Sequence, residues 1–176
     1  MADLIILHGP PASGKLTTAK QISAITGASI FHNHLTLDVS KSLFAFGTDE
    51  FWQLTNEIRA LSLEAHFKAG KSALIFTWCY EQPEDFWFLD KINQMAIKYS
   101  GRILPVFVEC TTESLEERVS NADRKSLDKL CSVDVLQAQI STKNYAPIPY
   151  ENCIKINSTK HSALVNAKVI VDSFKL

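Results

Sequence analysis

Short apolar runs alternate along the chain with longer segments in which apolar residues recur every three or four positions. Runs of the first kind are typical of buried strands, and segments of the second kind are typical of amphipathic helices. This alternation predicts an α/β fold built on a mostly parallel sheet. We expect five strands, over residues 3–8, 29–32, 72–79, 103–108 and 152–156.

Seven helices are expected between and after these strands, over residues 15–26, 35–46, 49–69, 83 to about 101, 112–120, 133–142 and 161–174. In the longest of them, spacings of three and four join five side chains into one apolar stripe, formed by Phe51, Leu54, Ile58, Leu61 and Ala65. The fourth strand contains Pro105, whose missing N–H removes a donor from the sheet.

Composition narrows the class of protein. The 176 residues fit one domain with a sizeable core, over residues 1–176. The net charge of -1 gives no general basic field for nucleic acid. The N-terminal apolar run is about five residues long, against the ~20 that a membrane-spanning helix needs. The four cysteines are scattered without a CxxC pair, which argues against a zinc or disulfide framework and favours a cytoplasmic protein.

The strongest chemical signal follows the first strand, where residues 9–15 read GPPASGK and fit the pattern GxxxxGK before a predicted helix. Glycines let the backbone approach a phosphate, and successive N–H groups with the helix N-terminus form an anion site. Lys15 adds a mobile cation for the β- and γ-phosphates. A glycine-containing turn before a helix is the alternative interpretation. We predict a nucleoside triphosphate site, with ATP expected, at Gly9, Pro10, Pro11, Ala12, Ser13, Gly14, Lys15, Leu16 and Thr17.

The next positions depart from the usual GxxxxGK[ST] pattern. Leu16 stands where a hydroxyl normally binds magnesium, and Thr17 follows it. This GKxT order resembles adenylate kinases, whose loops read GKGT. The resemblance implies that Thr17 contacts the α-phosphate and that Mg²⁺ is held mostly through water, so we expect no metal ligand from the protein in this loop.

Beyond the loop, several short segments carry a resemblance that covers nearly the whole chain. They are HGPPASGKLT at 8–17, FHNHLT at 31–36, LIFTWCY at 74–80, LEERV at 115–119 and APIP at 146–149. With them the chain resembles the small P-loop kinases: shikimate kinase, gluconate kinase, chloramphenicol phosphotransferase and the nucleoside monophosphate kinases. It resembles most closely a bacterial group of shikimate-kinase-like P-loop ATPases.

This resemblance implies a three-layer P-loop NTPase fold, with a five-stranded parallel sheet flanked by helices and the first strand near its centre. It implies an ATP-dependent small-molecule kinase that uses Mg²⁺, with an acceptor pocket after the second strand and a mobile lid over about 121–132. Shikimate kinases end the second strand in a carboxylate-rich motif. Here that place reads His32-Asn33-His34, so shikimate itself is not expected as the acceptor.

Two of the four arginines, Arg118 and Arg124, bracket the start of the predicted lid. Phosphoryl transfer needs cations on the phosphate oxygens, and the planar guanidinium suits them, so we predict catalytic roles for both together with Lys15. The alternatives are a surface pair of Arg118 with Glu113 or Glu117 and a solvated charge at Arg124.

Four further residues are candidates for binding the acceptor. His34 and Asp38 share one helix face at a spacing of four and can orient or deprotonate a hydroxyl. In relatives, the helix that carries Arg59 faces the acceptor, so Arg59 can clamp a carboxylate or phosphate. Trp78 ends the third strand, where open α/β sheets bind ligands, and can stack on an acceptor ring. The alternatives are a capping His34, exposed charges at Asp38 and Arg59, and core packing of Trp78.

The kinase hypothesis has one chemical gap, because no clear carboxylate stands at a buried strand end as a second magnesium partner. Glu81 and Glu109 are the candidates. Two other functions therefore stay open: a nucleotide hydrolase or switch that acts on a protein partner, and a module that senses nucleotide without turnover. The sequence leaves the oligomeric state and the identity of the acceptor undetermined.

Overall fold

The computed structural model describes residues 1–70, 73–121 and 130–176. Five parallel strands form one sheet in the order β2-β3-β1-β4-β5, so the α/β fold and the central position of the first strand are confirmed. The strands are β1 Asp3–His8, β2 Ser29–His32, β3 Ala73–Trp78, β4 Arg102–Glu109 and β5 Ile154–Asn157. The three inner strands, β1, β3 and β4, are mostly apolar because helices cover both faces of the sheet.

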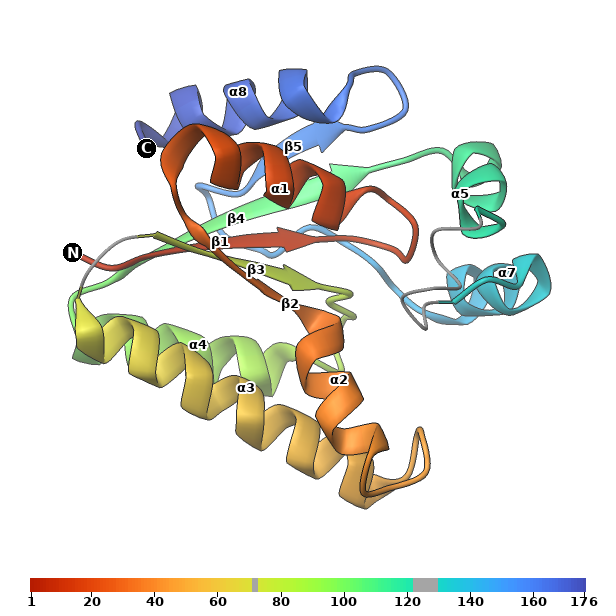
Figure 1. The fold of residues 1–176 in the computed structure, drawn as a ribbon, viewed down its shortest axis with the longest axis horizontal. Coiled ribbons are helices and arrows are strands. Elements are labelled where there is room, and N and C mark those ends of the chain that lie inside the picture. Colours follow the sequence, from red (N-terminus) through yellow and green to blue (C-terminus); the bar gives the residue numbers. More distant parts are fainter. Residues whose placement is uncertain (71–72, 122–129) are drawn as a thin grey trace.

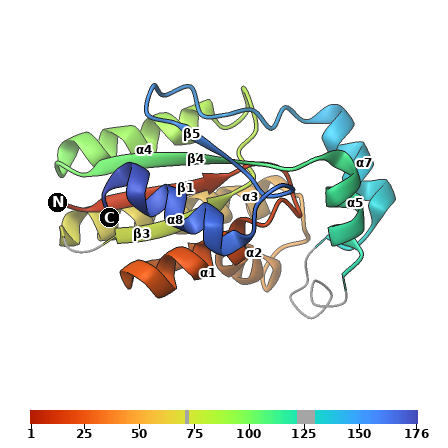
Figure 2. The same ribbon diagram turned by 90° about the horizontal axis from the view of Figure 1, so that it is seen from above.

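Helices cover both faces of this sheet, as Figure 1 shows. On one face lie α1 (Lys15–Thr26) and α8 (Ala163–Phe174), and on the other lie α3 (Asp49–Ala69) and α4 (Phe86–Lys98). The helix α2 (Asn33–Lys41) leads from β2 toward the start of α3. Two more helices, α5 (Thr112–Val119) and α7 (Val133–Thr142), extend beyond the carboxyl ends of the strands (Figure 2).

Several boundaries differ from the sequence prediction. The second helix begins at Asn33 directly after β2 and ends at Lys41, instead of spanning 35–46. The last helix begins after Ser162, whose hydroxyl accepts the N–H of Val165. Pro105 is tolerated in β4 because β5 pairs with β4 only from Val106 onward.

The apolar stripe predicted for α3 is right for Phe51, which is buried, but wrong at its other end, where Leu61 is 72% exposed. Besides Phe51, the buried face contains Thr55, Arg59, Ala60, Leu63 and Phe67. Two members of this face are polar, so a search for apolar periodicity selects the neighbouring row. The buried threonine donates to Ser40 of α2 at 2.8 Å, and the buried arginine faces the end of the sheet. Polar contacts therefore set the orientation of α3.

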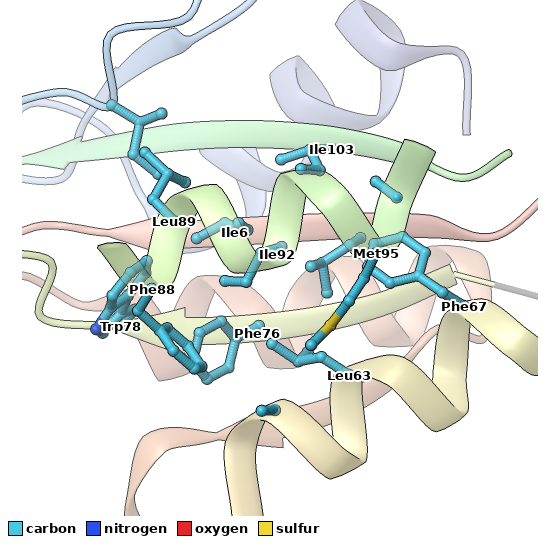
Figure 3. Close-up of a cluster of buried hydrophobic side chains, with 14 of the residues drawn as sticks. Ile6, Leu63, Phe67, Phe76, Trp78, Phe88, Leu89, Ile92, Met95 and Ile103 are labelled. Carbon is cyan, nitrogen blue, oxygen red and sulfur yellow. The ribbon is translucent and has the colours of Figure 1, made fainter. Parts of the chain in front are cut away.

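The largest core cluster fills the space between the sheet and the helices α3 and α4. Figure 3 shows Leu63, Phe76, Trp78, Phe88 and Met95 converging there. A second cluster on the opposite face joins the sheet to α1 and α8. Together the two clusters fix the sheet between its helical layers, so the strand ends form a rigid edge.

The α3 correction yields a stability test with a matched control. We expect Leu63→Ala to lower the free energy of unfolding by about 2–5 kcal/mol, because it leaves a cavity in this core. The control Leu61→Ala removes the same atoms from a side chain that is 72% exposed and should cost less than about 0.5 kcal/mol. Urea unfolding followed by circular dichroism measures both, and equal losses would contradict the observed orientation of α3.

Candidate active site

The backbone after β1 has the shape of a phosphate-binding loop. Gly9 has φ 140°, Ala12 has φ 64° and Gly14 has φ 90°, so three of six loop residues adopt left-handed conformations. A Cβ on Gly9 would lie 2.8 Å from the carbonyl oxygen of Val108 on β4, which leaves room for glycine alone. Such alternation of handedness turns successive N–H groups toward one concave side.

Ala12 adopts a left-handed conformation, which is unfavourable for any residue that has a Cβ atom. Packing of its methyl group offsets this unfavourable free energy. It packs into a small cluster with Leu115, Val119 and Leu136. These three side chains come from α5 and α7, the helices on either side of the predicted lid. The phosphate loop is therefore packed directly against the helices that flank the lid segment.

Lys15 begins α1 and folds back over the loop. Its ammonium group donates to the carbonyl oxygens of Gly9 at 2.9 Å and Pro10 at 2.6 Å. The first turn of α1 contains no acidic residue that would compete for this charge. Thr17 is exposed at the start of the same helix. The Lys15 ammonium group and the positive end of the α1 helix dipole therefore lie together beside the loop.

Arg118 reaches from α5 to the loop between β5 and α8. Its Nη2 donates to the carbonyl oxygen of Ser158 at 2.7 Å, and its Nη1 donates to Ser158 Oγ at 3.1 Å and lies 3.4 Å from Cys110 Sγ. Nη1 is also 3.8 Å from where a Cβ on Gly14 would be. The guanidinium therefore lies beside the phosphate loop. Arg124, the other predicted lid arginine, lies outside the described residues.

Arg59 lies at the other side of this edge, at the carboxyl ends of β2 and β3. It is 4% exposed, and it donates from Nη1 to Asn56 Oδ1 at 2.9 Å and from Nη2 to Asn33 Oδ1. Its Nε is buried without a hydrogen-bond partner in the described parts of the chain. Burial lowers the pKa of Arg59 to about 10, although Asp85 opposes that shift. A buried cation held by neutral amides is suited to an anionic ligand.

The predicted acceptor pair on α2 is brought to the same edge. Asn33, at the start of the helix, donates its N–H to Thr77 Oγ1 at 3.2 Å and so ties α2 to β3. His34 is half-buried beside His32, with ring centroids 6.5 Å apart. Asp38 is exposed one turn further along. His34 is thus the more buried of the two and lies closer in the chain to the end of β2.

Trp78 is the candidate whose surroundings contradict its predicted role. It is only 2% exposed, and its ring packs against Phe76, Tyr80 and Phe88 in the core (Figure 3). The side chain of Trp78, the last residue in β3, points into the core beneath α3 and α4. Core packing, the alternative weighed for this residue, is what the structure shows.

Sequence reasoning missed Asp85, after β3, and Lys143, after α7, and it considered Glu81 only as a magnesium partner. Glu81 forms an ion pair with Lys143, and Asp85 Oδ2 accepts the N–H of Glu81 at 2.8 Å. Burial raises the pKa of Asp85 to about 6, although the Glu81 N–H and then Arg59 act in the opposite direction. The signal for Asp85 was present, because it follows a buried strand, but the Pro-Glu-Asp run also fits an ordinary helix start.

A cavity of about 490 Å³ opens beside the phosphate loop, within the size range of small-molecule pockets. Its lining includes Pro10, Glu109, Leu115, Lys143 and Tyr145. The cavity therefore lies between the loop and the helices α5 and α7. This is the edge at which open α/β sheets bind ligands.

Solved structures of kinases share this architecture. A sugar kinase from Janibacter sp. HTCC2649 superposes with a TM-score of 0.71 at 16% identity, over 99% of this chain and 95% of that chain. A gluconokinase from Sinorhizobium meliloti 1021 superposes with a TM-score of 0.68 at 12% identity, over 99% of this chain and 91% of that chain. The APS kinase of Mycobacterium tuberculosis, solved with AMPPNP and APS, superposes with a TM-score of 0.63 at 11% identity, over 99% of this chain and 98% of that chain.

The chain shares the P-loop NTPase fold of these kinases. No family model and no curated protein matches it. In the parts of the chain that the structure describes, no helix is long and apolar enough to cross a membrane.

Metal-binding side chains are not clustered in the described parts of the chain. Among the described residues, no three His, Cys, Asp or Glu side chains are grouped closely enough to bind an ion. Glu81 forms an ion pair with Lys143, and the side chain of Leu16 contains no oxygen atom that could bind a metal ion. Magnesium in such a site would be bound by phosphate oxygens and water, as part of the MgATP substrate.

His8, the last residue of β1, is a buried neutral imidazole beneath the phosphate loop of this kinase fold. Its Nε2 accepts the N–H of Ile148 at 2.9 Å, so Nδ1 carries the proton and faces the carbonyl oxygen of Ile6 at 3.4 Å. Burial lowers its pKa from 6.5 to about 4, partly offset by Ile6 and reinforced by Lys15. The segment after α7 is thereby attached to the end of the central strand.

His8 should make stability depend on pH. Because the unfolded chain takes up this proton near pH 6.5 and the folded chain only near 4, stability falls as pH drops through that window. We expect the stability advantage of the wild type over His8→Gln to shrink by up to about 3 kcal/mol between pH 7 and 4. Urea unfolding at five pH values measures this difference, and parallel curves for the two proteins would contradict it.

Proposed function

We propose that this chain is an ATP-dependent phosphotransferase that moves the γ-phosphoryl group of ATP to a small-molecule acceptor. The observation that carries the proposal is the loop at residues 9–17, with its left-handed backbone, its lysine and its helix N-terminus. Support comes from the solved structures with this fold, which include sugar, gluconate and APS kinases.

On the nucleotide side, Lys15 and Arg118 would neutralise the charge that develops during transfer. Lys15 lies over the loop, where it donates to the carbonyl oxygens of Gly9 and Pro10, and Arg118 lies beside Gly14. Arg124 is proposed as a second lid cation on the strength of its sequence position. In a site closed from water these charges act at low effective dielectric and contribute more than they would at the surface.

On the acceptor side, Arg59 would bind an anionic group of the acceptor and His34 would contact its polar atoms. The buried Arg59 Nε without a partner, among the residues that the structure describes, is what favours an anion there. Asp38 is exposed and stays a weaker candidate on the same helix. The kinase proposal thus divides one sheet edge between a phosphate donor and an anionic acceptor.

The central test uses ATP labelled at the γ-phosphate, magnesium and a metabolite extract, followed by separation of the labelled products. We expect a labelled small molecule, and we expect Lys15→Ala to reduce its formation at least about 100-fold because a transition-state cation is lost. The matched control is Lys20→Ala, which removes an exposed lysine from the same helix and should act like the wild type. Label released only as free phosphate would argue instead for a nucleotide hydrolase.

Arg59 is tested with the acceptor recovered from that product. We expect Arg59→Gln to raise the acceptor KM at least about tenfold, since a charge-assisted contact contributes about 1.5–3 kcal/mol, while the affinity for MgADP stays unchanged. Stability should stay within about 1 kcal/mol, because removing a buried cation also removes its desolvation cost. Arg102→Gln, at the opposite end of the sheet, is the control. A loss of stability without a change in KM would mean that Arg59 is structural.

A further inference from the structure

Transfer to a hydroxyl group needs a base that takes the hydroxyl proton, and the end of β2 offers no carboxylate for this role. It reads His32-Asn33-His34, and the Asn33 side-chain oxygen is occupied by Arg59. A carboxylate reaches this edge from the turn between β3 and α4 instead. Asp85 lies within electrostatic range of Arg59, although the two make no ion pair.

The side chain of Asp85 does not perform the role that its position suggests. Asp85 is the N-cap residue of α4, where an aspartate ordinarily accepts a helix N–H, yet it makes no capping hydrogen bond. It turns back, and Oδ2 accepts the N–H of Glu81 at 2.8 Å. Within the described parts of the chain, Oδ1 has no hydrogen-bond partner. One oxygen is therefore held in place and the other is left open.

The turn that carries Asp85 belongs to the same edge as the phosphate loop. The ends of β3 and β1 are paired, so this turn starts beside the residue at which the loop starts. Glu81, which holds Asp85, forms an ion pair with Lys143, and Lys143 lines the cavity together with Pro10 of the loop. A continuous set of contacts thus connects the open carboxylate to the phosphate site.

We propose that Asp85 is the general base of the transfer and that the acceptor is therefore an alcohol; this rests on the kinase function proposed above. Oδ1 takes the hydroxyl proton while the acceptor oxygen forms a bond to the γ-phosphorus. The bond from that phosphorus to the β,γ-bridging oxygen breaks, and ADP leaves with the electron pair. The products are a phosphate monoester and ADP, and Asp85 returns its proton to water. Phosphate and carboxylate acceptors are already ionised and need no base.

The groups around Asp85 poise it for this task. Arg59 from α3 and Lys143 after α7 favour the carboxylate, whereas burial and Glu81 favour the protonated form. The phenol groups of Tyr80 and Tyr145 also face it. With burial the strongest influence, the pKa rises from 3.8 to about 6, closer to neutral pH, where a base is more effective. The active form is the carboxylate, so the rate should fall as pH drops below about 6.

The experiment compares the wild type with Asp85→Asn, using the γ-labelled ATP and metabolite extract described above, from pH 5 to 8.5. We expect Asp85→Asn to reduce transfer at least about 100-fold and to lose the acid limb of the profile. Affinity for MgADP should stay within twofold and Tm within about 4 °C. Asp85→Glu should recover part of the rate, and the exposed neighbour Glu84→Gln should match the wild type. The labelled product should survive acid, as a phosphate monoester does and a phosphate anhydride does not.

Each other outcome is decisive. Transfer by Asp85→Asn at more than a third of the wild-type rate would show that Asp85 is not the general base. An acid limb that persists in this variant would show the same. A matching loss of MgADP affinity or Tm assigns Asp85 to the turn alone. An acid-labile product overturns the alcohol acceptor. A wild type that labels no small molecule overturns the kinase function itself. This outcome is distinguishable from the others because they are scored only when the wild type labels a product.

Discussion

The close approach of Gly9 to the carbonyl oxygen of Val108 is the constraint on which the site depends. A Cβ on this residue would lie only 2.8 Å from that oxygen, so the position requires glycine. The chain also leaves β1 here with φ 140°, a conformation that only glycine adopts readily. From there the loop must curve through Ala12 and Gly14 before α1 begins. Because β1 and β4 are central strands fixed by cores on both faces, the loop inherits their rigidity. A phosphate cradle of this kind is preorganised before any ligand arrives.

Charge is distributed unevenly along the edge that this loop occupies. Lys15 and Arg118 lie beside the phosphate loop and Arg59 lies near the end of β2, while the imidazole of His8, at the end of β1, stays neutral. His8 could not carry a proton there without an unpaired charge next to Lys15 in the interior. Its neutrality lets it accept the N–H of Ile148, so the cost of a buried histidine is offset by a fixed connection.

The strands and their mostly parallel sheet could be predicted from sequence, because strands buried on both faces appear as apolar runs, and GPPASGK after such a run has one common structural meaning. The position of the first strand near the centre was implied only by the resemblance to small P-loop kinases. The orientation of α3 could not, because its buried face contains Thr55 and Arg59 and the apolar row beside it is a better match to the pattern. Trp78 shows the opposite limit: position at a strand end says which edge a residue is on, and not to which side its ring turns. Asp85 was hidden by a helix-start signal that its side chain does not use.

The segment after α7 joins features that the sequence leaves separate. Lys143 pairs with Glu81, Gln82 donates its N–H to the carbonyl oxygen of Asn144 at 3.0 Å, and Ile148 donates to His8. The helix from which this segment leaves packs through Leu136 against Ala12 of the phosphate loop. One stretch of chain therefore contacts the turn after β3, the end of β1 and, through α7, the loop itself. Since interiors packed in this way transmit displacement instead of absorbing it, the two halves of the edge are mechanically coupled. The turn that carries Glu81 and Asp85 is for this reason held in position relative to the phosphate loop by the segment after α7.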